Sequence, residues 1–348
     1  MLIGHGDDIY DYSGLVKHNF SSNVFLDIQM TGLKEHLCKR INDIDHYPPA
    51  MLTALERQLS ILLRNNQWEN IITNGATEAI YLLAQATGAG CRSAILVPTF
   101  SEYEDACRMH GHEVQYIRSL REVNDEMNMV WLCNPNNPTG MLIPREEIVS
   151  IAFNHPNVVF VIDQSYEYFC AEEQLQPREA SSLGNVIQLH SMTKKYSIPG
   201  IRLGYVTGPK PLMDTLRNYR MPWSVNALAV AACEYILTHQ EQFSFDIKTY
   251  LEEVQRLRLR LNSIDGITVL PTKTNFMLLH IPSQDAIVLK RKLVDDYGIL
   301  VRAAHNFVGL DRHYIRVATQ SAESNDLLVE AMRAVMLSHN DPSVLNRG

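Results

Sequence analysis

The sequence predicts an α/β protein that has a mainly parallel sheet in a large lobe and a second, smaller α+β lobe. The chain has 348 residues, of which 46% are apolar, and this is enough to build two packed lobes. Short β-branched or apolar runs alternate with amphipathic stretches up to about residue 224, which is the pattern of βαβ units. Beyond that point the alternation ends, and long helical stretches precede short strands.

In the large lobe, strands are predicted at residues 71–73, 94–97, 129–133, 158–163, 186–190 and 203–207. Amphipathic stretches between them predict helices at 79–87, 103–110 and 146–153. In a parallel sheet covered by helices, ligands bind at the carboxyl ends of the strands. The residues directly after each strand are therefore the first candidates for a functional site.

The C-terminal third has a different organisation. Helices are predicted at 225–239, 243–261, 286–296 and 323–339, and short strands at 268–270, 275–280 and 314–318. The first forty residues look irregular. These patterns predict an N-terminal arm at residues 1–40 that packs with the small domain, a large domain at 41–240, and a small C-terminal domain at 241–348.

Composition excludes several classes of protein. A net charge of −8 without a long basic run argues against nucleic acid as the main partner. No stretch has the roughly 20 apolar residues of a membrane span, and the N-terminus does not resemble a secretory signal. The six cysteines form no CxxC pair and the thirteen histidines show no ligand spacing, so no metal site is expected. We expect a cytoplasmic enzyme without a membrane or nucleic-acid partner.

Two segments can hold a phosphate group. Residues 74–78 read NGATE, follow a strand and open a helix, whose free N–H groups and dipole attract an anion. Such a corner alone is ordinary structure. Further along the chain, Ser191 and Thr193 precede Arg202, and these side chains can bind a phosphate beside a lysine.

The lysine and a carboxylate indicate the cofactor chemistry. Lys194 can form a Schiff base with an aldehyde cofactor; the neighbouring Lys195 is the rival, and the spacing to Arg202 favours Lys194. Asp163 ends a hydrophobic strand, where a carboxylate needs a cationic partner such as a protonated pyridine nitrogen. Taken with the phosphate segments and the ring of Phe100, these residues make up, in order, the parts of a pyridoxal 5′-phosphate site.

At this point the sequence resembles a known family. The motifs NGATE, PTF, NPNNPTG, DQSY and SMTKKYSIPGIRLGY, with the late Arg316, are similar to those of fold-type I pyridoxal-phosphate enzymes over nearly the whole chain. Within them the chain resembles the class I/II aminotransferase family, including the histidinol-phosphate aminotransferases. The run MPWSVNALA at residues 221–229 and the N-terminal His5-Gly6 bring it nearer to the threonine-phosphate decarboxylases of cobalamin biosynthesis. This resemblance implies a seven-stranded type of sheet.

The resemblance also implies residue roles. Lys194, Asp163 and Tyr166 would be catalytic. The expected cofactor contacts are Gly75, Ala76, Thr77, Phe100, Asn137, Asp163, Tyr166, Ser191, Thr193, Lys194 and Arg202, with Tyr47 reaching the phosphate from the neighbouring subunit of a homodimer. Phe100 would stack on the cofactor ring, and Asn137 and Tyr166 would bond its 3′-oxygen. The expected substrate contacts are His5, Gly6, Asn23, Asn137, Arg302 and Arg316.

One segment departs from the family pattern. Asp7 and Asp8 follow His5-Gly6, where the family usually has Gly-Asn. Two carboxylates near a substrate phosphate would repel it unless they point away or pair with Lys or Arg. Their placement therefore bears directly on the identity of the substrate.

The expected reaction is decarboxylation of L-threonine O-3-phosphate to (R)-1-amino-2-propanol O-2-phosphate. Arg302 and Arg316 suit a small substrate that carries both a carboxylate and a phosphate. The alternative is an aminotransferase that acts on histidinol phosphate or another amino acid, because the cofactor residues are shared. A non-catalytic ligand-binding protein is a third hypothesis, against which Lys194, Asp163 and Arg202 together argue.

Overall fold

The computed structural model describes residues 7–12, 14–25, 28–66 and 69–339. Contacts divide the chain into two compact units, which are described separately below. The small unit consists of Met1–Asn23, Asn137–Met141 and Asp246–Gly348, and the large unit of Val24–Asn136 and Leu142–Phe245.

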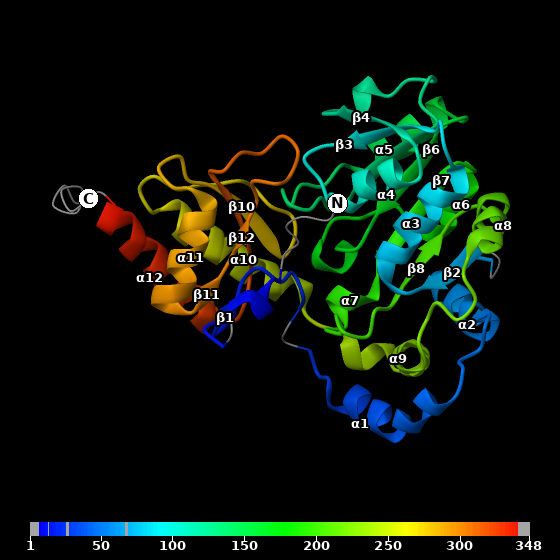
Figure 1. Cartoon of the computed structure of the whole chain (residues 1–348), viewed down its shortest axis with the longest axis horizontal. Helices are drawn as coiled ribbons and strands as arrows, with labels where there is room; N and C mark the ends of the chain where they lie inside the picture. Colours follow the sequence, from blue (N-terminus) through cyan, green and yellow to red (C-terminus); the bar gives the residue numbers. More distant parts are fainter. Residues whose placement is uncertain (1–6, 13, 26–27, 67–68, 340–348) are drawn as a thin grey trace. The chain divides into compact units, whose positions relative to one another are not determined.

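The large unit contains a seven-stranded sheet with the strand order β2-β8-β7-β6-β5-β3-β4 (Figure 1). The strands are β2 (Asn70–Thr73), β3 (Arg92–Leu96), β4 (Glu113–Ile117), β5 (Met129–Cys133), β6 (Val159–Asp163), β7 (Val186–Ser191) and β8 (Gly204–Thr207). Strands β3 to β7 pair in parallel, whereas β8 runs antiparallel to both of its neighbours. The predicted α/β class with a mainly parallel sheet is confirmed. Of these seven strands, only β4 was not predicted, because this edge strand is largely exposed and reads as a polar segment.

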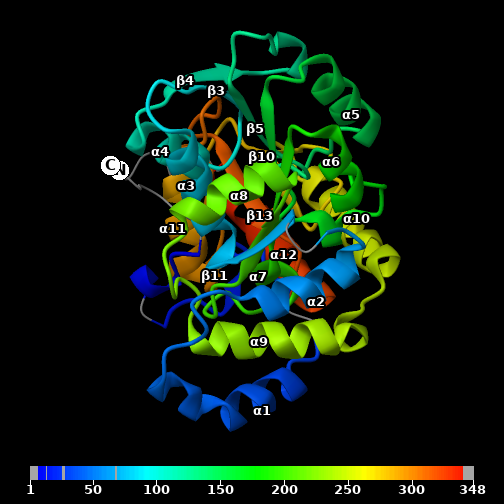
Figure 2. The ribbon, with the colours of Figure 1, turned by 90° about the vertical axis from the view of Figure 1, so that its right-hand side faces the viewer.

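The described part of the large unit contains nine α-helices, several of which cover the two faces of this sheet. They are α1 (Thr31–Lys39), α2 (Thr53–Leu63), α3 (Gly75–Thr87), α4 (Glu102–Met109), α5 (Arg145–Asn154), α6 (Pro177–Leu183), α7 (Met192–Lys195), α8 (Lys210–Tyr219) and α9 (Ala227–Thr238). Figure 2 shows α3 and α5 on opposite sides of the sheet. β5 and β7 are buried along their whole length, and β5 is a continuous apolar run, whereas β7 also buries the polar residues Gln188 and His190.

The small unit contains a four-stranded antiparallel sheet of order β12-β13-β10-β9 and a two-stranded parallel pair of β1 and β11. These strands are β1 (His18–Asn19), β9 (Thr268–Val269), β10 (Phe276–His280), β11 (Ile299–Leu300), β12 (Arg302–Ala303) and β13 (Tyr314–Ala318). Helices α10 (Ile247–Asn262), α11 (Ala286–Tyr297) and α12 (Ala322–His339) complete the unit. Phe20 is fully buried in its core with Leu257, Met277 and Leu293, which anchors the N-terminal segment there.

The predicted N-terminal arm is divided between the units at Asn23. Residues 31–39, expected to be irregular, form α1, which packs on α9 in the large unit. Leu33 is its one buried apolar residue and belongs to the same hydrophobic cluster as Ile236 of α9. A short helix of this kind depends on tertiary packing more than on its own sequence, so local patterns did not reveal it.

A buried ion pair ties α2 to the sheet in the large unit. Arg220 donates to Glu56 at 3.2 Å, both side chains are 4% exposed, and burial raises the pKa of the Glu56 carboxyl. We expect Arg220→Met to lower the free energy of unfolding by about 3–5 kcal/mol, because it leaves a buried charge without its partner. Urea unfolding measures this loss. The exposed pair of Lys210 and Asp214 is the control, since Lys210→Met should change little.

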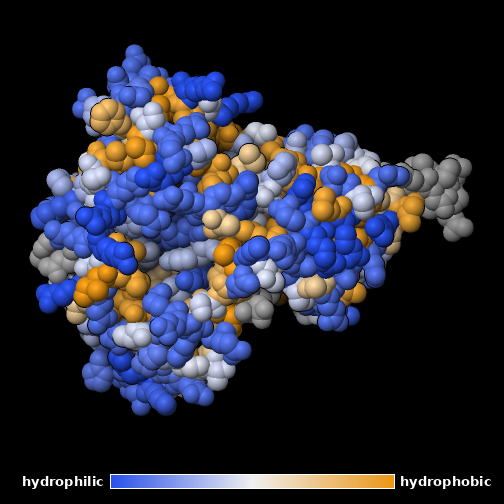
Figure 3. Space-filling view, turned by 180° about the vertical axis from the view of Figure 1, so that it is seen from behind, coloured by the Kyte–Doolittle hydropathy of each residue, from blue (hydrophilic) through white to orange (hydrophobic). Residues whose placement is uncertain are grey.

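The surface and the cysteines are unremarkable. On the face shown in Figure 3, hydrophilic residues predominate and apolar residues form small groups. In the described part of the chain, no helix has both the length and the apolar character needed to span a membrane. All six cysteines are free thiols, five of them buried and Cys38 exposed. Among the described residues, no cluster of His, Cys, Asp or Glu is arranged to hold a metal ion.

Candidate active site

The large unit places the predicted cofactor residues at the carboxyl ends of neighbouring strands. Asp163 is the last residue of β6, and the parallel strand β7 beside it ends at Ser191. The short helix α7 starts directly after β7 and carries Thr193 and Lys194. The fold therefore gathers these side chains at the sheet edge where ligands bind in α/β proteins.

Asp163 is held in place by two donors. The Tyr103 hydroxyl donates to Oδ2 at 2.6 Å, and the backbone N–H of Ser165 donates to Oδ1 at 2.8 Å. The Asp163 side chain is 4% exposed, and Tyr103 is stacked on Trp131 at 5.7 Å between ring centroids. Burial and the nearby carboxylate raise the pKa of Tyr103, which therefore stays protonated and keeps donating. Both donors are neutral, and a cationic group such as a protonated pyridine nitrogen stabilises a carboxylate buried in this way.

Arg202 lies against the N-terminus of α3. Gly75, the first residue of that helix, has φ +76°, and a Cβ at this position would lie 2.8 Å from Arg202 Nη2. The first N–H groups of α3, which include those of Ala76 and Thr77, have no partner within the helix. A guanidinium and the positive end of a helix dipole repel each other, and an anion bound between them relieves the repulsion. The donor set thus fits the phosphate of the expected cofactor.

Gly204 allows this close approach. A Cβ on Gly204 would lie 2.7 Å from the backbone nitrogen of Ala76 and 2.8 Å from the carbonyl oxygen of His190. We expect Gly204→Ala to lower the free energy of unfolding by about 1–3 kcal/mol, because backbone atoms must move. It should also weaken cofactor binding, which titration of the apoprotein measures. Gly200→Ala is the matched control, since nothing lies within 4 Å of its Cβ position.

The two adjacent lysines have different surroundings. The Lys195 ammonium lies over the ring of Tyr168, 4.2 Å from its centroid, and over that of Tyr196 at 5.1 Å. Burial lowers the pKa of Lys195. Consecutive side chains leave a helix about 100° apart, so Lys194 points in another direction from this aromatic pair. This difference supports Lys194 over Lys195 as the residue that binds the cofactor.

Three aromatic candidates occupy distinct positions in the large unit. Phe100 packs edge-on to Tyr103 with ring centroids 5.8 Å apart. Tyr166 is 6% exposed and lies three residues after Asp163. Tyr47 is 83% exposed and contacts the ring of Trp223, so it lies on the protein surface.

The predicted substrate arginines are neighbours in the small unit. Arg302 on β12 and Arg316 on β13 are paired in register, and they are 6% and 5% exposed. Arg316 donates to Asn137 Oδ1 at 2.5 Å and to the Ser21 carbonyl at 2.6 Å, and Arg302 donates to Asn306 Oδ1 at 2.7 Å. Burial and the charge of Arg316 lower the pKa of Arg302. Two buried guanidinium groups in this arrangement favour the binding of anions.

The N-terminal segment carries two carboxylates, each of which has a partner in the small unit. Asp8 forms an ion pair with Lys290 of α11, and Asp7 accepts a hydrogen bond from Asn19 at 2.5 Å. Carboxylates beside a bound phosphate must point away from it or pair with a cation. Asp8 pairs with the cation of Lys290. Asn23 is buried, and its carbonyl accepts from Asn275 at 3.1 Å. His5 and Gly6 lie outside the described residues.

Sequence reasoning did not identify Tyr103, Gly204, Asn306 or Lys290 as parts of these sites. Tyr103 follows Phe100 by three residues, yet only the fold brings its hydroxyl to the carboxylate of Asp163.

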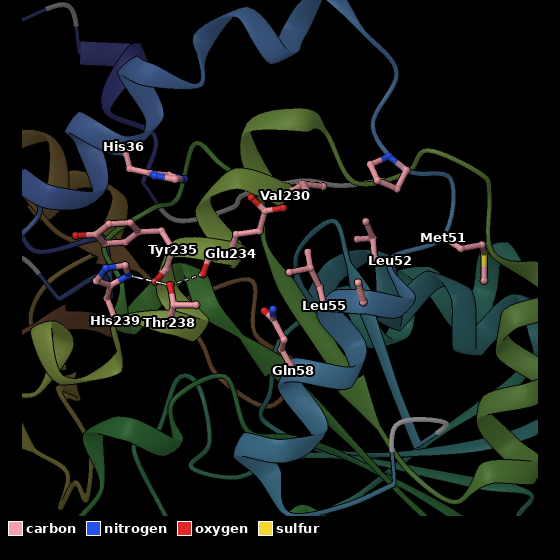
Figure 4. Close-up of a pocket in the computed structure, with 12 residues that line it drawn as sticks. His36, Met51, Leu52, Leu55, Gln58, Val230, Glu234, Tyr235, Thr238 and His239 are labelled. Atoms are coloured by element: carbon pink, nitrogen blue, oxygen red, sulfur yellow. Dashed lines mark hydrogen bonds between the residues drawn. The ribbon is translucent and has the colours of Figure 1, made fainter.

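A cavity in the large unit lies apart from the cofactor candidates. Figure 4 shows it between α1, α2 and α9, lined mainly by apolar side chains such as Leu52, Leu55 and Val230.

Comparison with known proteins identifies the family. The family model described as "Aminotransferase class I and II" matches residues 16–334. The chain belongs to this family. Its enzymes depend on pyridoxal 5′-phosphate, which agrees with the fit of Asp163 and of the anion site at Arg202. The predicted family resemblance is thereby confirmed.

Several relatives of this class I/II chain carry more specific names. It is 32% identical to a putative threonine-phosphate decarboxylase of Caldanaerobacter subterraneus, covering 95% of the chain and 93% of the relative. A solved L-threonine-O-3-phosphate decarboxylase of Porphyromonas gingivalis is 38% identical, with a TM-score of 0.89 and coverage of 92% and 99%. A histidinol-phosphate aminotransferase of Desulfitobacterium hafniense is 26% identical, over 88% of each chain.

Proposed function

We propose that this chain catalyses the pyridoxal-phosphate-dependent decarboxylation of L-threonine O-3-phosphate. The product would be (R)-1-amino-2-propanol O-2-phosphate, used in cobalamin biosynthesis. The observation that carries the proposal is the pair of buried guanidinium groups, Arg302 and Arg316, on adjacent strands. A substrate with one carboxylate and one phosphate supplies two anionic groups to two cations, and guanidinium contacts fix the orientation of both. The names of the two decarboxylases compared above support this choice.

The cofactor and the protein have separate tasks. Pyridoxal 5′-phosphate, when bound, supplies an electron sink for the pair of electrons left on Cα when one of its bonds breaks. Asp163 would keep a proton on the pyridine nitrogen, and Arg202 with the N-terminus of α3 would hold the phosphate. Lys194 would bind the aldehyde carbon and later deliver a proton to Cα.

The substrate contacts decide which group leaves Cα. If both arginines held the substrate carboxylate, that group would stay on Cα, Lys194 would take the Cα proton and the outcome would be transamination. If Arg302 instead anchors the side-chain phosphate and Arg316 orients the carboxylate, the bond between the carboxylate and Cα would be the one that breaks, and carbon dioxide would leave. Asn137, which accepts from Arg316, would help to fix this arrangement.

A product assay tests the proposal. Cofactor-loaded protein is incubated with L-threonine O-3-phosphate without a keto acid, and carbon dioxide and the phosphorylated amino alcohol are measured. We expect both in equal amounts. If carbon dioxide is absent and amino groups pass from histidinol phosphate to a keto acid, the chain is an aminotransferase, the alternative favoured by its 26% identity to such an enzyme.

We also propose that the enzyme is a cytoplasmic homodimer. Large apolar side chains are exposed in and near one segment: Tyr47 is 83% exposed, Ile44 61% and Met51 51%, and Trp223, which contacts Tyr47, is 51% exposed. Such a group favours burial against a second copy. The free cysteines accord with a reducing compartment.

Sedimentation should give twice the monomer mass. Tyr47→Phe should weaken cofactor binding about tenfold, because it removes one hydrogen bond to the cofactor phosphate. A monomer with unchanged cofactor affinity would contradict this proposal.

A further inference from the structure

A partly buried ion pair forms on α11, the helix next to the strand of Arg302 in the small unit; its side chains are 9% and 27% exposed. Lys290 lies on α11, and its ammonium binds Asp8 Oδ2. Helix α11 packs on β12, the strand that carries Arg302. The charge of Asp8 raises the pKa of Arg302, opposite to the effect of Arg316, so the carboxylate and the guanidinium interact. The ion pair to α11, the packing of α11 on β12 and this electrostatic effect together place the carboxylate of Asp8 near the anion site of Arg302.

The second carboxylate oxygen of Asp8 is open to a further donor. Asp8 Oδ1 is buried and, within the described ranges of the chain, accepts no hydrogen bond. A buried acceptor without a donor is costly, and most such atoms in native proteins are satisfied by a partner, a water molecule or a ligand. An anion bound by Arg302 could satisfy Oδ1 only through a group that carries a hydrogen, because a bare anionic oxygen would repel the carboxylate.

We propose that Asp8 is a specificity-determining residue that accepts a hydrogen bond from an O–H group on the anion bound by Arg302. The inference rests on the proposed function in one respect, namely that this anion is the phosphate of the substrate. A singly protonated phosphomonoester has such an O–H group, whereas a sulfate or a carboxylate has none. Asp8 thus selects a protonated phosphate by attraction and excludes other anions by repulsion.

Binding of two small anions tests this selection. Inorganic phosphate and sulfate are both tetrahedral, but at neutral pH only phosphate carries an O–H group. Each is titrated calorimetrically into cofactor-loaded protein, so that the cofactor occupies the anion site at Arg202. We expect phosphate to bind about 10- to 100-fold more tightly than sulfate, the range of a hydrogen bond to a charged group. In Asp8→Asn the two affinities should differ by less than about threefold, mainly because sulfate binds better.

Two further variants serve as controls. Asp7→Asn changes the adjacent carboxylate and should keep the preference for phosphate; Asp7 has φ +65°, which Asn tolerates. Lys290→Gln retains Asp8 but removes its cation, so both anions should bind more weakly while phosphate remains preferred. This variant tests the proposal even if Asp8→Asn does not fold. Equal affinities in the unaltered protein, or a preference that survives in Asp8→Asn, would overturn the inference.

Decarboxylation measured on the same samples separates this inference from the proposed function. Release of carbon dioxide from L-threonine O-3-phosphate without any preference for phosphate overturns the role of Asp8 and leaves the function standing. A preference that disappears in Asp8→Asn, without release of carbon dioxide, supports the role of Asp8 and overturns the function.

Discussion

Lys194→Ala is expected to lower carbon dioxide release from L-threonine O-3-phosphate by at least about 1000-fold. The variant loses both the amine that binds the cofactor aldehyde and the group that moves the proton at Cα. It should also lose the visible absorbance of the lysine-bound cofactor. Absorbance spectra and initial rates on protein reconstituted with pyridoxal 5′-phosphate measure both effects.

Lys195→Ala is the matched control for this prediction. It removes an ammonium group of the same kind from the neighbouring position, where Lys195 lies over the rings of Tyr168 and Tyr196. The variant should lose some stability but keep the visible absorbance and most of the activity. If Lys195→Ala abolished the absorbance and Lys194→Ala kept it, the assignment of the two lysines would be reversed.

Asp163→Asn is expected to lower kcat by about 100- to 1000-fold with little change in fold. The amide has the same shape as the carboxylate, but it cannot supply the negative charge that stabilises a protonated pyridine nitrogen. Steady-state kinetics at saturating cofactor measure the loss, and a circular dichroism spectrum checks the fold.

Tyr103→Phe separates the charge of Asp163 from its positioning. The hydroxyl donates to Asp163 at 2.6 Å, and its removal leaves the charge in place while loosening the carboxylate. We expect a smaller loss of kcat, about tenfold, which corresponds to one hydrogen bond to a charged group. A Tyr103→Phe effect as large as that of Asp163→Asn would mean that position rather than charge is decisive.

Much of the large unit follows from local sequence. The strand prediction for β5 agrees with the structure at both ends, and those for β2, β3, β6, β7 and β8 agree within two residues. The central residues of these strands are buried and mostly apolar or β-branched, so they are recognised without tertiary information. The exposed edge strand β4 and the helix α1 lack such a pattern, and both form because neighbouring elements are there to pair or pack with them.

The candidate site shows the same contrast between features that local sequence predicts and features that only tertiary packing creates. Lys194, Asp163 and residues 74–78 could be predicted because they lie at or just after the end of a strand, and Arg202 because of its spacing to Lys194; each residue type suits a particular part of the cofactor. The hydroxyl of Tyr103 under Asp163 could not, since the two residues are 60 positions apart and only sheet packing joins them. The same holds for the ion pair of Asp8 and Lys290, whose partners are 282 positions apart.

The amino-acid sequence by itself determined the α/β class, the family and the candidate cofactor residues, because these depend on apolar runs and on short motifs within one segment. Tertiary structure alone decided which donors hold Asp163, why Gly204 must be small, and how Asp8 is compatible with an anion site. The physical reason is that charge pairing and close backbone contact arise between segments far apart in the chain, whose approach no local pattern records.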